Sequence, residues 1–369
     1  MSPSEVPRHA RCSDGRLDLK SLTLEELTEW MGPLGKAKGR ALQVYKALWQ
    51  RGETDLSRIS TIPKTVRREL QERAEITWLE PVARQDSVDE TRKYVWSCAD
   101  GSTIESVLIP DRDRASPGRD RLTLCISTQE GCAMACRFCL TGDLGLKRNL
   151  SPSEIANQSL QVQQDLGPER PLTNIVLMGM GEPLHNYRNL IRALKNLLHP
   201  NGQNFSHRRI TVSTVGLVPA LKRLAHTLPV NIAVSLNATT ESQRRRVMPI
   251  TEKYSMAELM QTCRELPLPS GKRITFEYVM MKGFNSTLED AERLVQLMKD
   301  VPSKVNLIPY NENPQRDICR PSDVQVGAFH HHLVSNGVNC SIRITRGRDI
   351  SAACGQLGKA AEKMATRLG

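Results

Sequence analysis

Six short apolar runs, most of them separated by segments with helical periodicity, occupy the chain between residues 122 and 309. Each run has the length of a β-strand, and the intervening segments repeat apolar residues every three or four positions. Strands that alternate with helices form parallel sheets through right-handed crossovers. The sequence therefore predicts an α/β fold built as a partial (β/α)6 barrel, with a doubly wound sheet as the alternative. The runs begin near Leu122, Asn174, Arg209, Val230, Arg273 and Lys304.

Smaller units flank this expected barrel. Thr23 followed by Glu26 predicts a capping box at the start of a helical block. An alternating segment that turns around Ala99, Asp100 and Gly101 predicts a β-hairpin. The expected units are a disordered N-terminus (1–20), a helical accessory domain (21–80), a hairpin and linker with a charged loop (81–121), the barrel (122–345) and a C-terminal tail (346–369).

The chain of 369 residues carries 51 Lys and Arg against 40 Asp and Glu, a formal net charge of +11. A basic surface attracts polyanions such as nucleic acids, although the same excess can serve solubility alone. The first twenty residues are polar and lack the apolar centre of a signal peptide. No run approaches the roughly 18 apolar residues of a membrane span. We therefore expect a cytoplasmic protein without a membrane segment.

Three of the ten cysteines stand within eight residues, directly after the first strand-like run, as Cys132, Cys136 and Cys139. Thiolates are ligands for zinc and for iron–sulfur clusters. Structural zinc normally takes four ligands, whereas this group supplies three, with no second CxxC and no His nearby. Three ligands leave one iron of a four-iron cube open, and an open iron can bind S-adenosylmethionine (SAM). The spacing thus favours a 4Fe-4S cluster over zinc or unrelated cysteines.

The CxxxCxxC spacing, with Phe138 before the last cysteine, resembles the signature of the radical SAM superfamily. The sequence GMGEP at Gly179–Pro183, after the next run, resembles its glycine-rich SAM motif. Further segments, including ESVLIP, RITVSTVG, AVSLNA, VNLIPYN and TRGRDISAACGQL, resemble the bacterial adenine methyltransferases of this superfamily. That resemblance runs from about Ser21 to Leu357. It implies a radical SAM barrel with a 4Fe-4S cluster and SAM as cofactors, acting on adenine C2 of 23S ribosomal RNA and, in one branch, transfer RNA.

The resemblance also implies a ping-pong use of two SAM molecules. Cys354 takes a methyl group from the first, and the second yields a radical that activates this S-methyl group for addition to the adenine ring. Cys125 then releases the product by thiol attack and leaves a disulfide. Glu105 matches the family's general base, although the loop 114–121 behind it is longer than usual. From the residues alone, Cys354 can be a small buried residue, Cys125 a strand-core residue or fourth cluster ligand, and Glu105 an exposed strand residue.

Most strand-like runs end in small or polar groups, which fits one shared site at the strand ends but also ordinary turns. The SAM contacts that the resemblance carries over are Gly181, Glu182, Ser213, Ser235, Leu236, Asn237 and Asn311.

An RNA partner requires a flipped adenine, and the helical N-terminal block is expected to grip the surrounding RNA shape. Three groups of arginines either hold phosphates or form a solvated face. We also expect a monomer and a flavodoxin-type electron donor. Two other functions stay open: methylation of adenine C8, as in the resistance branch of the family, and a non-catalytic RNA-binding protein with a structural metal. The arginine groups are 208–209, 244–246 and the set Arg343, Arg346 and Arg348.

Overall fold

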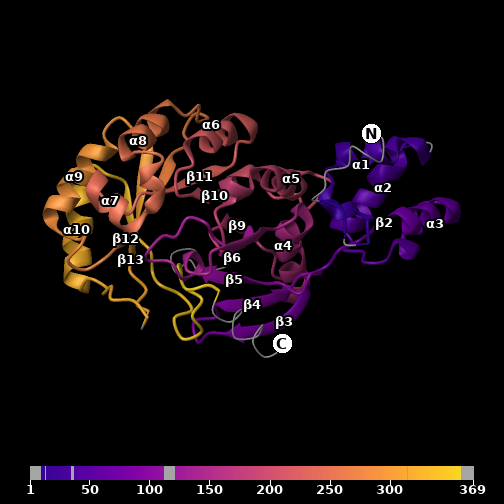
Figure 1. Cartoon of the computed structure of the whole chain (residues 1–369), viewed down its shortest axis with the longest axis horizontal. Coiled ribbons are helices and arrows are strands. Elements are labelled where there is room, and N and C mark those ends of the chain that lie inside the picture. Colours follow the sequence, from indigo (N-terminus) through magenta and orange to yellow (C-terminus); the bar gives the residue numbers. More distant parts are fainter. Residues whose placement is uncertain (1–9, 13, 35–36, 112–120, 314, 359–369) are drawn as a thin grey trace.

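The structure, a computed structural model, describes residues 10–358 apart from positions 13, 35–36, 112–120 and 314. Its core consists of parallel strands that follow one another across the sheet in sequence order. These strands run through the centre of the molecule in Figure 1. They are β6 (Arg121–Cys125), β9 (Asn174–Leu177), β10 (Ile210–Thr214), β11 (Asn231–Ser235), β12 (Ile274–Met280), β13 (Ser303–Pro309) and β14 (Cys340–Ile342).

Helices connect each of these strands to the next, and all six predicted runs are strands, so the expected α/β core is confirmed. A doubly wound sheet reverses its strand order at one point. Because this order does not reverse, the doubly wound alternative is wrong. The connecting helices are α4 (Pro152–Leu166), α5 (Tyr187–Leu198), α6 (Val218–Thr227), α7 (Glu241–Val247), α8 (Met256–Glu265), α9 (Leu288–Met298) and α10 (Asp323–Ser335).

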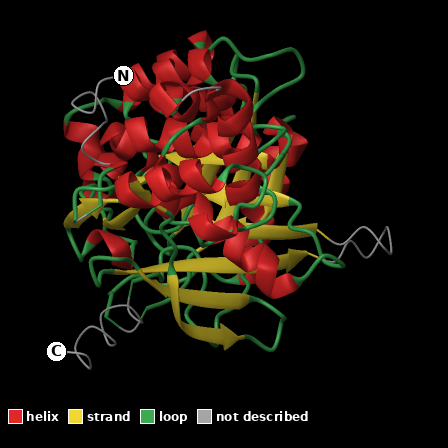
Figure 2. Ribbon diagram, turned by 90° about the vertical axis from the view of Figure 1, so that its right-hand side faces the viewer, coloured by secondary structure: helices red, strands yellow, loops and turns green. Residues whose placement is uncertain are grey.

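Helix α5 illustrates how the sequence produces this packing. Leu190, Ala193, Leu194 and Leu197 are fully buried, and their spacing places them on one face of the helix. Other connecting helices also pack an apolar face against the sheet, and Figure 2 shows most helices on one side of it. Within the described residues, no helix is both long and apolar enough to cross a membrane.

Three antiparallel strands extend the sheet beyond β6. They are β3 (Glu80–Asp86), β4 (Arg92–Ser97) and β5 (Thr103–Asp111), and β5 pairs with β6. The predicted turn around residues 99–101 is confirmed. The expectation of a linker is wrong, because β5 is almost entirely buried and hydrogen-bonded on both sides. The charged loop falls mainly on residues 112–120, outside the described part of the chain.

The N-terminal block contains the helices α1 (Leu24–Trp30), α2 (Ala37–Trp49) and α3 (Lys64–Arg73), and lies beside α4 and α5 in Figure 1. The predicted capping box of α1 is present. The Tyr45 hydroxyl lies 2.9 Å from Asn196 Oδ1 of α5, and Lys20 Nζ lies 3.0 Å from Asn157 Oδ1 of α4. The block is therefore joined to the barrel through its polar side chains.

The expected disorder of residues 1–20 is wrong for residues 10–12 and 14–20, which include the buried Ala10 and a β-bridge between Arg11 and Leu17. Leu17 and Asp18 form strand β1, which pairs with β2 (Ala74–Glu75). Leu17 and Leu19 are buried in the core, and Lys20 is buried as well. These apolar residues order the segment because they bury area against the helical block. Residues 1–9 lie outside the described part of the chain.

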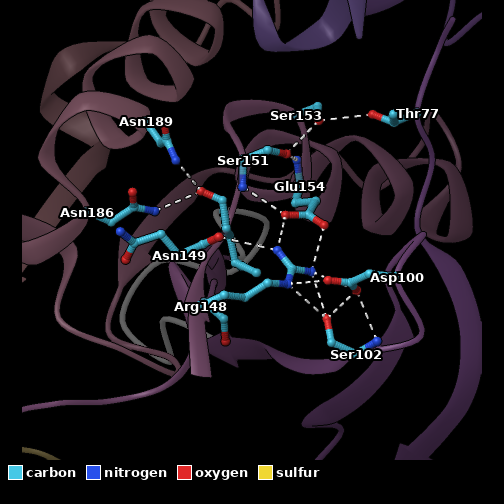
Figure 3. Close-up of polar contacts among 12 residues, drawn as sticks. Thr77, Asp100, Ser102, Arg148, Asn149, Ser151, Ser153, Glu154, Asn186 and Asn189 are labelled. Atoms are coloured by element: carbon cyan, nitrogen blue, oxygen red, sulfur yellow. Dashed lines mark hydrogen bonds and ion pairs between the residues drawn. The ribbon is translucent and has the colours of Figure 1, made fainter. Parts of the chain in front are cut away.

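A polar network braces the base of the cysteine loop (Figure 3). The loop is closed by the hairpin of β7 (Gln129–Gly131) and β8 (Leu146–Asn149). Arg148 of β8 donates to both carboxylate oxygens of Glu154 on α4, at 2.8 and 2.9 Å. The same guanidinium donates to Asp100 and Ser102 in the β4–β5 turn, at 3.1 and 2.7 Å. One side chain thus fastens the cysteine loop to a helix and to the antiparallel extension.

Candidate active site

The carboxyl ends of the parallel strands surround a cavity with about 980 Å³ of space, part of it open to solvent. This is the edge at which β/α barrels bind ligands, because the loops converge there. Leu236 is an exception among the predicted contacts: its side chain is buried in the core, and it is not among the residues that line the cavity. The predicted cluster and SAM residues that line the cavity are Cys132, Cys136, Cys139, Gly181, Glu182, Ser213, Ser235, Asn237 and Asn311.

Main-chain geometry folds the cysteine loop over this cavity. Gly131, at the end of β7, has a φ of +72°. A Cβ at this position would lie 1.8 Å from the carbonyl oxygen of Gly145, so the close approach of the hairpin requires glycine. Cys132 N donates to that same oxygen at 2.8 Å, and Cys139 N donates to Cys136 O at 3.0 Å. The loop therefore presents its three thiols from a turn that is closed by hydrogen bonds.

The three thiols fit an iron–sulfur cluster. Burial raises the pKa of Cys132 to about 12, and it raises the pKa of Cys136 well above its usual value, with further increases from the charges of Cys139 and Cys132. Such thiols are poor nucleophiles unless a metal ion deprotonates them. Among the described residues, no three His, Cys, Asp or Glu side chains converge closely enough for a single metal ion. Cys132, Cys136 and Cys139 all line the same cavity, which fits thiolates that share one iron–sulfur cluster.

The glycine-rich loop after β9 forms the next part of the wall. Gly181 has a φ of +96°, and a Cβ there would meet the Gln129 side chain at 2.5 Å. Glu182 is buried, and its carboxylate accepts hydrogen bonds from Val215 N at 2.9 Å and Leu184 N at 3.0 Å. Burial raises the pKa of Glu182 to about 7, although these hydrogen bonds oppose the shift. A buried carboxylate of this kind gains from a cationic ligand group such as an ammonium.

Two asparagines supply polar atoms at the ends of β11 and β13, on either side of β12. Asn237 has a φ of +57°, and its Oδ1 accepts a hydrogen bond from Val279 N at 2.8 Å. Asn311 Nδ2 donates to Cys354 O at 3.1 Å, whereas the buried Asn311 Oδ1 has no hydrogen-bond partner. Buried acceptors are normally satisfied, so this oxygen indicates a donor on a ligand. Together with Glu182 and the open side of the cysteine loop, these groups fit SAM.

A second, smaller cavity adjoins the first and holds the other predicted thiols. Cys125 and Cys354 both line it, and Cys354 lines the large cavity as well. The suggestion that Cys125 is a fourth cluster ligand finds no support, because Cys125 borders the smaller space and not the one shared by the three cluster thiols. Burial raises the pKa of Cys125 to about 12, and the Cys354 thiol adds to this shift. All ten cysteines are free thiols.

Arg343 and Glu277 are functional candidates that the sequence did not single out for this site. Arg343 lines both cavities, and the neighbouring Cys354 raises its pKa more than any other group does. Glu277 lies on β12 at the cavity wall, where burial raises its pKa. A carboxylate within the otherwise apolar run around Glu277 was the available signal. Arg343 was considered as a phosphate ligand, whereas the structure places it beside the two thiols.

Glu105 is completely buried on β5, so the suggestion of an exposed strand residue is wrong. It is not among the residues that line either cavity. Cys125 pairs directly with Val107, which is two residues from Glu105 on the same strand. Side chains two positions apart share a face, and so do directly paired residues of antiparallel strands. Glu105 therefore stands on the same face of the sheet as Cys125.

The basic groups have different surroundings. Arg244 is buried and donates to the carbonyl oxygen of Val215 at 2.6 Å and to Thr251 Oγ1 at 3.0 Å. Its role as a phosphate ligand is wrong, because these interactions occupy it within the protein. Arg208 and Arg245 are exposed, so they stay candidates for an RNA surface.

Comparison with known proteins identifies the fold and the site together. The family model of the radical SAM superfamily matches residues 126–298, and that of the ribosomal RNA large subunit methyltransferase N-terminal domain matches residues 17–76. A solved radical SAM methyltransferase from Sphaerobacter thermophilus superposes with a TM-score of 0.83 at 39% identity, covering 92% of this chain and 98% of that one. The parallel core described above is thus a radical SAM fold.

Curated relatives match over nearly the whole length. The dual-specificity RNA methyltransferase RlmN of Geobacter sulfurreducens is 50% identical over 344 residues, which cover 93% of this chain and 92% of the relative. The RlmN of Anaeromyxobacter dehalogenans is 49% identical over 351 residues, with 93% and 92% coverage. Sequence identity of about 50% over 93% of the chain is enough to assign the chain to the family of these relatives. The chain belongs to the RlmN family of radical SAM RNA methyltransferases.

Proposed function

We propose that this protein methylates carbon C2 of an adenine in 23S ribosomal RNA, with transfer RNA as its second substrate. Relatives that share about half of its residues are named dual-specificity RNA methyltransferases. The observation that carries the proposal is the position of Cys354, which lines both the cavity of the cluster thiols and the cavity of Cys125. One sulfur can therefore exchange a group at the first site and be attacked at the second.

Membership of the radical SAM superfamily implies a 4Fe-4S cluster and SAM as cofactors. We assign the cluster to Cys132, Cys136 and Cys139, and the SAM ammonium to Glu182. Bound there, the two cofactors supply one-electron chemistry, which an adenine C2–H requires because it is neither acidic nor nucleophilic. The unpartnered Asn311 Oδ1, the strand-end groups Ser213, Ser235 and Asn237, and the main chain of Gly181 complete the SAM contacts that we assign along the cavity wall. Leu236 stays a prediction from the family resemblance, because it does not line this cavity.

The two remaining site thiols divide the transfer between them. Cys354 carries the methyl group as a thioether between its donor and the RNA base. Cys125, as a thiolate, then attacks the sulfur of Cys354 and forms an S–S bond, while the bond from sulfur to the product carbon breaks and its electron pair stays with that carbon. The carbon takes up a proton and becomes the methyl group of the released RNA, so the two thiols are oxidised to a disulfide as the carbon is reduced. Arg343 borders both cavities, and a guanidinium beside a thiol favours the reactive thiolate. The disulfide must be reduced before the next cycle.

Glu105 is assigned as the base that removes the proton from the adenine ring. Its support is the register of β5 with β6, which puts Glu105 on the face of Cys125. Because it is buried and outside the cavity lining, a small movement of β5 or of the tail must bring its carboxylate to the substrate. If Glu105 has this role, a Glu105→Gln enzyme should still form the covalent adduct with RNA, but the adduct should keep the C2 hydrogen of the adenine.

The other expected properties accompany this function. A cytoplasmic location, a monomeric state and a flavodoxin-type electron donor fit an enzyme that reduces a cluster and modifies RNA. The helical N-terminal block, which matches the N-terminal domain of ribosomal RNA methyltransferases, is assigned to RNA binding. A non-catalytic RNA-binding protein would have no use for two thiols in adjoining cavities, so we set that alternative aside.

The experiment is an anaerobic assay with reconstituted cluster, SAM, a reductant and unmodified RNA. Adenine labelled with deuterium at C2 in one sample and at C8 in another reports which ring position loses its hydrogen. We expect 2-methyladenosine, with loss of the C2 label, from both ribosomal and transfer RNA. Loss of the C8 label instead would assign the protein to the C8 branch, and unmodified RNA would refute the proposal.

A further inference from the structure

The segment that carries Cys354 is held from two sides. We name residues 346–357 the Cys354 segment. On the side of the cluster, Leu140 N donates to Gly355 O at 2.8 Å and Thr141 Oγ1 donates to Leu357 O at 2.9 Å. On the opposite side, the contacts come from the antiparallel extension of the sheet. The position of the Cys354 thiol therefore depends on both attachments.

The central contact on the side of the extension is made by Lys93 of β4. Lys93 is 3% exposed, so its ammonium has left solvent almost completely. Its Nζ lies 2.6 Å from the carbonyl oxygen of Ile350 and 3.4 Å from that of Ser351. These carbonyls precede Cys354 by four and three residues. A buried cation is costly unless its donors are satisfied, and here the Cys354 segment supplies the acceptors.

The register of the sheet relates Lys93 directly to the other reactive thiol. Lys93 pairs with Val107 on β5, and Val107 pairs with Cys125 on β6. Directly paired residues share a face, so Lys93 and Cys125 stand in one row, two strand spacings or roughly 10 Å apart. Lys93, which holds the Cys354 segment, and Cys125, the proposed resolving thiol, therefore lie in the same row across the sheet.

The charge of the Lys93 ammonium also matters for holding the Cys354 segment. Burial lowers its pKa, and the carboxylate of Glu105, on the same face of the neighbouring strand, opposes that shift. A lysine that merely filled space here could be replaced by an aliphatic residue without loss. An ammonium that donates to two successive carbonyls instead fixes the orientation of a main chain, because each donor restricts where its acceptor can lie.

We propose that Lys93 is a positioning residue that fixes the Cys354 segment relative to Cys125 through its hydrogen bonds to the main chain of Ile350 and Ser351. This inference rests on the proposed function. A thiol that must serve two adjoining cavities in turn depends on accurate placement, since misplacement by about 1 Å can cost two orders of magnitude in rate. Lys93 acts through the Cys354 segment and touches neither the cluster thiols nor the cavity.

Further contacts from the β3–β4 turn hold the same segment. Ser87 Oγ donates to Asp349 Oδ1 at 2.6 Å, and Gly347 N donates to Asp89 Oδ2 at 2.9 Å. These contacts are part-buried, as is the contact of Lys93 with Ile350. They provide an independent second site for testing whether the extension anchors the segment.

The test compares Lys93→Met, Lys93→Arg and, as a control, Lys222→Met with the reconstituted wild type. Met keeps the apolar stem of lysine and removes the donors, whereas Arg keeps them. Lys222 lies on α6 with half of its side chain exposed. The readouts are cluster content, the methyl occupancy of Cys354, the ratio of 5′-deoxyadenosine to methylated adenosine, and hydrogen exchange of residues 346–357.

For Lys93→Met we expect a normal cluster content and faster hydrogen exchange in the Cys354 segment. We also expect at least tenfold more 5′-deoxyadenosine per methylated adenosine. A tenfold change corresponds to the lower end of the free energy of a charge-assisted hydrogen bond. Lys93→Arg should bring the ratio of 5′-deoxyadenosine to methylated adenosine part of the way back to the wild-type value, and Lys222→Met should match the wild type. A wild-type ratio and wild-type exchange in Lys93→Met would overturn the proposal.

Two further outcomes are also decisive. If Lys93→Met fails to fold, the double variant Ser87→Ala, Asp89→Asn must loosen the segment and raise the ratio, and its failure to do either would equally overturn the proposal. Hydrogen exchange needs no RNA. If the wild type methylates no RNA while Lys93→Met loosens residues 346–357, the proposed function fails and the anchoring role stands.

Discussion

The difference between Cys354 and Cys125 arises from what surrounds each sulfur. Cys354 borders both cavities and lies on a segment held by hydrogen bonds from Asn311, the cluster loop and the extension. Cys125 is a strand residue that borders only the smaller of these two spaces, and burial raises its pKa to about 12. Arg343 opposes that rise. In the function that we propose, the first thiol meets the substrates and the second meets the first.

This arrangement predicts the behaviour of a Cys125→Ala enzyme. Without the resolving thiol, the bond between the product carbon and the Cys354 sulfur cannot be broken, so protein and RNA should remain covalently joined. A denaturing gel with labelled RNA should show the adduct, and digestion should place it on the peptide of Cys354. Cys263→Ala, at a buried cysteine in α8, is the matched control and should form no adduct. Normal turnover by Cys125→Ala would contradict the resolving role.

Residues carried by a local motif could be predicted from the sequence, because the motif fixes both their identity and their place after a strand. Cys132, Cys136, Cys139 and Glu182 are examples. Lys93 could not be predicted in this way, since its acceptors lie more than 250 residues away and only the folded chain brings them together. Arg244 was misjudged because its neighbours in sequence are exposed while its own side chain is buried.

At the level of elements, the hairpin of β7 and β8 determines the position of the cysteine loop. The sequence predicted the loop itself, but not the hairpin, because β7 and β8 have three and four residues and show little periodicity. Arg148 compensates for this short pairing by joining β8 to α4 and to the β4–β5 turn. The linker expected before β6 also proved to be part of the sheet, which explains how that turn reaches Arg148.

An Arg148→Met variant should therefore lose stability and cluster together. Removing the guanidinium leaves the carboxylates of Glu154 and Asp100 without their main cation. Because the Asp100 side chain is 50% exposed and that of Glu154 only 14%, the loss comes mainly from Glu154 and amounts to about 1–3 kcal/mol. Denaturant unfolding should give a lower free energy, and iron content after reconstitution should fall. Arg208→Met, at an exposed position, should change neither quantity. A fully loaded, equally stable Arg148→Met protein would show that the hairpin needs no brace.

On the scale of the whole molecule, the N-terminal block and the barrel meet around a buried lysine. Lys20 Nζ bonds to Asn157 of α4 and lies over the rings of Trp49 and Trp78, at 5.4 and 3.9 Å from their centroids. The helical and strand periodicities of the sequence predicted the helices of the block and the strands of the barrel. Their docking depends on side chains that are far apart in the chain, such as Tyr45 and Asn196, and periodicity contains no information about such pairs.

Lys20 predicts a pH dependence of stability. Burial lowers its pKa from 10.5 to about 7, so between these values the unfolded chain binds a proton that the folded chain does not. The free energy of unfolding should therefore rise with pH across this window, by up to about 1.4 kcal/mol per pH unit, and level off below about pH 7. Unfolding of wild type and Lys20→Met at about pH 7 and about pH 9 measures the difference. If the wild type gains nothing over the variant at the higher pH, Lys20 keeps its proton in the folded state.

The most direct test of the whole account follows one methyl group. The protein is loaded at Cys354 with a labelled methyl group, freed of SAM, and then given RNA, reductant and unlabelled SAM. The account predicts that the label leaves the peptide of Cys354 and appears at adenine C2 within the first turnover. Label that stays on the protein while unlabelled 2-methyladenosine accumulates would contradict it.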